Sequence, residues 1–197
     1  MPRLLALTLL AFGIGATPIA AQRAGPPASP HPRTYVFVHG ATGGGWDWRV
    51  VDSLLSLDGH RAVRPTLTGL GERVHLASPS IGLATHIDDV VNAILWENLH
   101  DVILVGHSYG GVVITGVADR IPERIRRLVY LDALLPESGE TALELADSIG
   151  VTYIRPNVRD GFIVLPGMAD NRAVPRDVPQ PLRTFTDTLR LSNPAMR

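Results

Sequence analysis

A serine flanked by glycines two positions before and two positions after it is the feature of this sequence that most directly indicates chemistry. The pattern G-x-S-x-G is typical of a nucleophilic serine on a sharp turn between a strand and a helix. Such a turn exposes the serine hydroxyl and aims the next main-chain N–H toward a developing oxyanion. The sequence therefore predicts acyl transfer at Ser108, with the Tyr109 amide as one oxyanion donor, within the segment Gly106-His107-Ser108-Tyr109-Gly110. A glycine-rich turn that only packs is the alternative.

A second glycine-rich turn follows the first apolar run. Its amides could supply the second oxyanion donor, for which Ala41, in the segment His39-Gly40-Ala41, is the candidate. A phosphate cradle is the alternative, but the loop lacks both the Lys-Ser/Thr ending of a P-loop and the G-x-G-x-x-G spacing. Arg64 could favour the 2′-phosphate of NADPH, which keeps a dinucleotide site open.

The sequence offers no general base for this serine. Triad residues in proteins with this elbow follow the order Ser, Asp/Glu, His, yet every histidine precedes Ser108: His31, His39, His60, His75, His86, His100 and His107. The side chain of His107 should diverge from its neighbour on a tight turn, and the other rings are expected to be structural or solvated. Asp132 is a candidate acid, although a hydrogen-bonded residue that closes a strand is the better interpretation. Because loss of the base costs about six powers of ten in turnover, we expect this chain alone to be nearly inert.

Four apolar runs predict the strands that position these residues. The runs are continuous and alternate with helical patterns, which favours a parallel sheet with helices on both faces. In chain order the runs cover 35–38, 62–63, 102–106 and 128–131. A helix is expected after Thr85 as N-cap, and a short one over 141–148.

The termini and composition define the remaining organisation. Residues 1–21 have the charged start, short apolar stretch and small cleavage residues of a signal peptide, so we expect a secreted or periplasmic protein without a membrane span after cleavage. A proline-rich tether over 22–33, a core over 34–136 and a cap over 137–197 would follow. The net charge of −1 and the lack of a basic run argue against a nucleic-acid partner, and the lack of cysteine excludes disulfides and thiolate sites.

Several segments together resemble the plant-type esterase and hydroxynitrile lyase branch of the α/β-hydrolases and its bacterial esterase relatives. They are His39-Gly40-Ala41, Leu67-Thr68-Gly69-Leu70-Gly71-Glu72-Arg73, the serine elbow and Leu131-Asp132-Ala133. The resemblance implies a serine hydrolase of small carboxylic esters, with Ser108 as nucleophile, the Ala41 and Tyr109 amides as oxyanion hole, an apolar pocket under a cap, and neither metal nor organic cofactor. It also implies that His39 supports the loop that carries Ala41, and that the strands lie in the order 62–63, 35–38, 102–106 and 128–131 across the sheet. Finally, it implies a C-terminally truncated chain, because the acid and histidine of the family lie beyond two further strands. The strand over 128–131 would then be a bare edge.

Three hypotheses remain open at this point. The first is a truncated serine esterase, the second a catalytically dead protein of the same fold that binds a small ester or related molecule, and the third a dinucleotide-binding fragment. The sequence does not indicate an oligomeric state. Glu72 and Arg73 are expected to form an ion pair within their loop.

Overall fold

The computed structural model describes residues 31–146, 150–166, 168 and 177–193. The predicted signal peptide over 1–21 and most of the tether over 22–33 lie outside these residues. Arg33, at the end of the tether, is already tied to the core, because its N–H donates to Nδ1 of His60 at 3.2 Å and its carbonyl accepts from the N–H of Arg61 at 2.9 Å.

Four parallel strands form the main sheet. They are β1 (Thr34–Val38), β2 (Arg61–Val63), β3 (Val102–Ser108) and β4 (Ile125–Ala133), in the order β2-β1-β3-β4. This is the predicted order, and the apolar residues of neighbouring strands are in register, as in the pairs Val36 with Leu104 and Leu104 with Leu128. β3 and β4 are longer than the apolar runs predicted, because sheet pairing continues through their polar ends.

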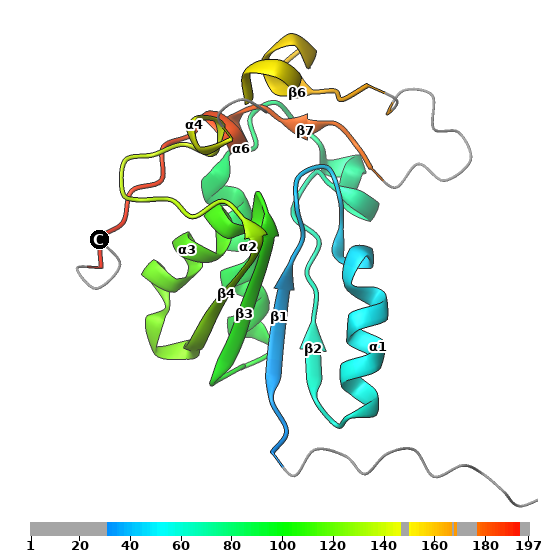
Figure 1. Cartoon of the computed structure of the whole chain (residues 1–197), viewed down its shortest axis with the longest axis vertical. Helices are drawn as coiled ribbons and strands as arrows, with labels where there is room; N and C mark the ends of the chain where they lie inside the picture. The colour runs from blue at the N-terminus through cyan, green and yellow to red at the C-terminus, as the bar shows by residue number, and fades with distance from the viewer. Residues whose placement is uncertain (1–30, 147–149, 167, 169–176, 194–197) are drawn as a thin grey trace, which may run out of the picture.

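Helices cover both faces of this sheet, as predicted (Figure 1). On one face lie the short helical turn η1 (Gly45–Trp48) and α1 (Arg49–Leu57), which pack over Phe37 and Val105. On the other face lie α2 (Leu83–Trp96) and α3 (Gly110–Arg120), which enclose the larger apolar core. The prediction that Thr85 caps α2 is wrong: the helix begins at Leu83 after Gly82, which is extended and has no side chain to cap with.

Most of the described residues between 137 and 186 form a layer over the carboxyl ends of β1 and β3 (Figure 1). We call this layer the cap. Its helices and turns are α4 (Ala142–Leu145), η4 (Gly150–Ile154), η5 (Arg155–Asn157) and α6 (Arg183–Thr186). Its strands are β5 (Val158–Arg159), β6 (Phe162–Ile163) and β7 (Gln180–Pro181), an antiparallel sheet that the sequence did not predict.

The predicted helix over 141–148 is present as α4. Thr141 caps it: its Oγ1 accepts from the N–H of Glu144 at 3.2 Å, and Oε2 of Glu144 accepts from the N–H of Thr141 at 2.9 Å. The predicted end of this helix falls partly on residues outside those described.

The outer edge of the main sheet matches its prediction. Within the described residues, β4 pairs with β3 alone, and the side chain of Leu131 near its end is 50% exposed. An unpaired strand edge with apolar side chains invites pairing with another strand. In the same part of the chain, no helix has the length and apolar character needed to cross a membrane.

Candidate active site

Ser108 lies on a strained turn at the junction of β3 and α3. Its φ is +52°, in the left-handed region that a residue with a side chain rarely adopts, and strain of this kind clusters at functional sites. The flanking positions must be glycine because neighbouring main chain lies too close to leave room for a Cβ. A Cβ on Gly106 would lie 2.6 Å from the carbonyl oxygen of Gly110. A Cβ on Gly110 would lie 2.8 Å from the carbonyl oxygen of His39. The segment over 106–110 is therefore a sharp bend.

The turn after β1 meets this bend directly. A Cβ on Gly40 would lie 3.3 Å from the Cβ of Ser108 and 3.0 Å from Nδ1 of His107, so a side chain there would crowd the serine. Ala41 and Tyr109 line the same cavity as Ser108. Among the described residues, neither of their main-chain N–H groups has a hydrogen-bond acceptor. Two unpaired amides beside a strained serine are what an oxyanion hole requires.

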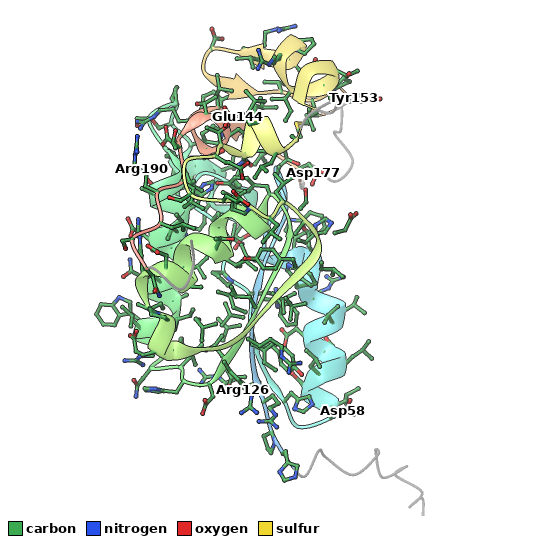
Figure 2. All side chains as sticks on the ribbon, turned by 60° about the vertical axis from the view of Figure 1, so that its left-hand side comes forward. Asp58, Arg126, Glu144, Tyr153, Asp177 and Arg190 are labelled. Atoms are coloured by element: carbon green, nitrogen blue, oxygen red, sulfur yellow. The ribbon has the colours of Figure 1, made fainter. Side chains whose placement is uncertain are left out.

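The cavity beside Ser108 has a volume of about 610 Å³ and lies between the sheet and the cap. Apolar side chains dominate its wall: Leu134, Leu145, Ala146, Ile154, Ile163, Leu165, Pro166 and Phe185. Thr42 and Gln180 add polar groups, and no Asp, Glu, Lys or Arg of the described residues lines it. Tyr153 belongs to the lining too, and Figure 2 shows it at the cap end of the molecule, opposite Asp58 and Arg126. The site suits a neutral, largely apolar ligand.

Two histidines near the site are buried and fully engaged. Nδ1–H of His39 donates to the carbonyl of Gly40 at 2.8 Å, and its Nε2 accepts from the N–H of Leu67 at 3.1 Å. Nε2–H of His86 donates to the carbonyl of Thr68 at 3.0 Å, and its Nδ1 faces the Tyr109 hydroxyl at 3.0 Å. Burial lowers the pKa of each ring to about 4. Both are neutral structural groups, and His39 holds the turn that carries Ala41.

Tyr109 is anchored by its side chain. The ring is completely buried and stacks on Phe185 with 5.0 Å between ring centroids. Its hydroxyl donates to His86 and lies beside the hydroxyl of Thr184, and burial raises the pKa of the phenol. These contacts fix the position of Tyr109, which lines the cavity beside Ser108.

Among the residues that the structure describes, no histidine serves as a base for Ser108. All seven histidines lie within the described residues, and none forms a hydrogen bond with Oγ of Ser108 there. His107 is exposed, and its ring forms a T-shaped contact with Trp48, with centroids 6.5 Å apart. Asp132 sits in a bulge with φ +45°, since Ser108 pairs with Ala133, and its exposed side chain makes no hydrogen bond to the described residues. The expectation that Asp132 is hydrogen-bonded is therefore not met.

The glycine-rich part of the loop after Thr42 is packed against the segment that follows β2. The N–H of Gly45 donates to Oγ1 of Thr66 at 2.8 Å, and a Cβ on Gly45 would lie 2.2 Å from the carbonyl oxygen of Arg64. Arg64 itself donates to Asp52 at 2.8 Å. These packed groups argue against a dinucleotide cradle. In the part of the chain that the structure describes, no three His, Cys, Asp or Glu side chains gather as metal ligands.

The predicted ion pair between Glu72 and Arg73 is wrong. Arg73 pairs instead with Asp89 on α2 at 3.0 Å. Asp89 also accepts from the N–H and hydroxyl of Thr68, at 2.6 and 2.7 Å. The 67–73 loop is thus held to α2, because a helix carboxylate satisfies its main-chain donor as well as its cation.

Sequence reasoning missed two polar residues of the cap, Gln180 and Thr184. Both side chains are 0% exposed, and Gln180 lines the cavity. Their signal in the sequence is weak, since an isolated Gln and Thr among prolines is typical of a surface loop.

Comparison with known proteins places this geometry in a family. The model of the alpha/beta hydrolase family matches residues 35–196. A carbendazim hydrolyzing esterase of Nocardioides sp. (strain SG-4G) is 56% identical over 111 residues, which cover 56% of this chain and 46% of the relative. The alpha-hydroxynitrile lyase of Arabidopsis thaliana is 32% identical over 139 residues, covering 68% and 47%. The chain thus spans about half the length of the curated relatives it matches.

A solved structure agrees with these sequence matches. An extracellular alpha/beta-hydrolase from a Paenibacillus species, described as sharing structural and functional homology with tobacco salicylic acid binding protein 2, superposes with a TM-score of 0.63 at 28% identity. The superposition covers 82% of this chain and 72% of that one. The four-stranded parallel sheet, its helices and these relatives together show that the chain belongs to the alpha/beta hydrolase family, in the branch of the plant esterases and hydroxynitrile lyases and their bacterial esterase relatives.

Proposed function

We propose that this chain carries the nucleophile and oxyanion half of a serine esterase site. One observation carries the proposal: Ser108, at φ +52°, lines an apolar cavity together with Ala41 and Tyr109, whose main-chain N–H groups have no acceptor among the described residues. In the proposed reaction, Oγ of Ser108 attacks the ester carbonyl carbon. The Ala41 and Tyr109 amides stabilise the oxyanion, the alcohol departs, and water later releases the acid from the acyl-serine.

The proton of Ser108 needs an acceptor that no histidine of this chain supplies in the described geometry. Without a base, a serine hydrolase loses about six powers of ten in turnover, while oxyanion stabilisation and binding retain roughly 10³ to 10⁴ over the uncatalysed reaction. Hydrolysis at an ordinary enzymatic rate therefore requires an imidazole other than those of the seven histidines of this chain. Without it, Ser108 should be acylated slowly, and the acyl-serine should be hydrolysed slowly.

The proposed substrates are small neutral esters with an apolar acyl group. A cavity of about 610 Å³ is in the usual range for a small-molecule site, and its wall carries no Asp, Glu, Lys or Arg from the described residues. A charged substrate would lose its hydration there without a compensating partner. Carbendazim belongs in the first substrate panel because a relative that is 56% identical over part of its length is named for its hydrolysis.

Chemical rescue by imidazole tests this proposal on the chain as it is. We expect 4-nitrophenyl acetate to acetylate Ser108 at a rate that rises with imidazole concentration, since free imidazole accepts the proton that a missing histidine would take. Mass spectrometry of the peptide that contains Ser108 measures the adduct. The Ser108→Ala variant gives the background from imidazole acting in solution. If Ser108 stays unmodified at every imidazole concentration, the serine is not a nucleophile.

A binding protein without catalysis is the second candidate function. The apolar cavity together with a serine that no base contacts favours it. It predicts that a neutral ester binds the wild-type chain and the Ser108→Ala variant equally, with no acetylation in imidazole. Acetylation confined to Ser108 would reject it.

A further inference from the structure

A buried amide from the cap holds the turn that carries Ala41. Gln180 of β7 is 0% exposed, and its Oε1 accepts from the N–H of Thr42 at 2.9 Å. Its Nε2 donates to Oγ1 of Thr184 at 2.8 Å. The Thr184 hydroxyl in turn donates to the carbonyl of Pro181 at 2.6 Å. The oxygen of the Gln180 amide therefore accepts one hydrogen bond and its nitrogen donates another, which fixes the orientation of the amide.

Thr42 needs this support. Its φ of +65° is in the left-handed region, which is a genuine outlier for a β-branched residue and persists only where the surroundings hold it. The cap holds both of its main-chain polar groups, because its carbonyl accepts from the N–H of Val178 at 3.0 Å while its N–H donates to Gln180. The peptide bond between Ala41 and Thr42 is thus fixed in space by a segment almost 140 positions further along the chain.

The same segment also contacts the residue that carries the other amide. Thr184 lies beside the Tyr109 hydroxyl, and Phe185, the next residue of α6, stacks on the Tyr109 ring. One short piece of the cap, 180–185, therefore contacts both Thr42, next to Ala41, and Tyr109. A shift of this piece would move the amides of Ala41 and Tyr109 relative to each other.

We infer that Gln180, held by Thr184, is a positioning residue for the oxyanion turn and couples the placement of the cap to the geometry of the two amides. The inference rests on the proposed function of Ser108, Ala41 and Tyr109. An oxyanion donor acts only when it lies within hydrogen-bond distance of the oxyanion. A loosened Thr42 should therefore weaken binding of a tetrahedral anion while leaving the apolar cavity able to bind a neutral ligand.

A pair of ligands with the same apolar group separates these two effects. One is 2-phenylethylboronic acid: a lone pair of the Ser108 oxygen forms a bond to boron, the hydroxyl proton passes to the buffer, and boron becomes a tetrahedral anion. The other is 4-phenyl-2-butanone, which is neutral and reports binding in the cavity. Titration calorimetry gives both affinities, and ¹¹B NMR distinguishes tetrahedral from trigonal boron.

The test uses Thr184→Val, which keeps the shape of the side chain and removes the hydroxyl that holds Gln180. We expect its affinity for the boronic acid to fall roughly tenfold or more, somewhat less than the loss of a whole oxyanion donor, while its affinity for the ketone is unchanged. Thr184→Ser should restore boronic-acid binding. Thr186→Val is the matched control, because Thr186 is exposed on the same helix. Gln180→Met provides a second variant, and thermal unfolding shows which variants fold.

The outcomes separate the two levels of the proposal. Equal losses for both ligands, or an unchanged boronic-acid affinity in folded Thr184→Val and Gln180→Met, would overturn the positioning role and leave Ser108 as the nucleophile. A boronic acid that stays trigonal and binds wild type and Ser108→Ala alike would overturn the proposed function, and this inference with it.

Discussion

Acidification from pH 7 to pH 5 should strongly destabilise this protein through two buried rings. His39 and His86 are both 0% exposed, and both use their two ring nitrogens in hydrogen bonds. Nε2 of His39 accepts from the N–H of Leu67, which requires the neutral ring. Burial lowers the pKa of each ring from 6.5 to about 4. Protonation would place a cation among groups that already have partners, with no exposed path to water.

The sign and size of the effect follow from proton linkage. Between pH 6.5 and 4 the unfolded chain binds protons on these rings and the folded chain does not, so the free energy of unfolding falls as the pH falls. Well above pH 6.5 neither state binds these protons, and the free energy of unfolding has its full value. Between pH 7 and pH 5, each ring should lower the free energy of unfolding by about 2 kcal/mol, and the two together by about 4 kcal/mol. This is a large share of the roughly 5–15 kcal/mol by which domains are stable.

Urea unfolding at a series of pH values from 7.5 to 5 measures this change. We expect the midpoint to fall steadily with pH at constant slope in urea, since the same surface is exposed. His39→Asn retains a short amide beside Gly40 but cannot titrate, so it should show about half of the wild-type pH dependence. A wild-type midpoint that is flat over this range, or a variant whose midpoint changes as steeply as wild type, would refute the assignment of neutral buried rings.

Three further predictions concern single features of the chain. Gly106→Ala should lower the free energy of unfolding by about 1–3 kcal/mol in urea, because its Cβ would meet the Gly110 carbonyl at 2.6 Å; an unchanged midpoint would contradict the elbow geometry. Asp89→Ala should lower the free energy of unfolding by about 3 kcal/mol, because Thr68 and Arg73 lose their acceptor. Asp88→Ala removes an exposed ion pair with Arg120 and should lower it by less than about 1 kcal/mol. Equal losses for the two variants would contradict the role of Asp89. Expression of residues 1–197 in a secreting host should release protein that begins at Gln22, as read by mass spectrometry, and a retained residue 1 would reject the signal peptide.

The main sheet and the serine bend were predictable because their determinants are local. Each strand is a short apolar run closed by a polar or glycine residue, and burial on two faces requires continuous apolar sequence. The elbow is equally local, because a left-handed serine between a strand and a helix needs glycines at fixed offsets, here Gly106 and Gly110. Strand order followed from the family resemblance.

The errors fall where a polar side chain has two available partners. Arg73 could pair with its neighbour Glu72 or with a residue of another element, and only folding brought Asp89 to 3.0 Å from it. The start of α2 was misplaced for a related reason: a serine- or threonine-type cap is a preference of about 1 kcal/mol, which the packing of Leu83 in the core overrides.

By itself, the sequence determined the nucleophile candidate, the parallel sheet beneath it and the order of all seven histidines before Ser108, since each is a matter of residue type at fixed spacing. Only the tertiary structure decided which histidines are neutral supports, that the cap contains a small antiparallel sheet, and that Gln180 reaches Thr42. The physical reason is distance along the chain. A hydrogen bond between residues 138 positions apart depends on how every intervening element packs, and no local pattern of apolar and polar residues encodes it.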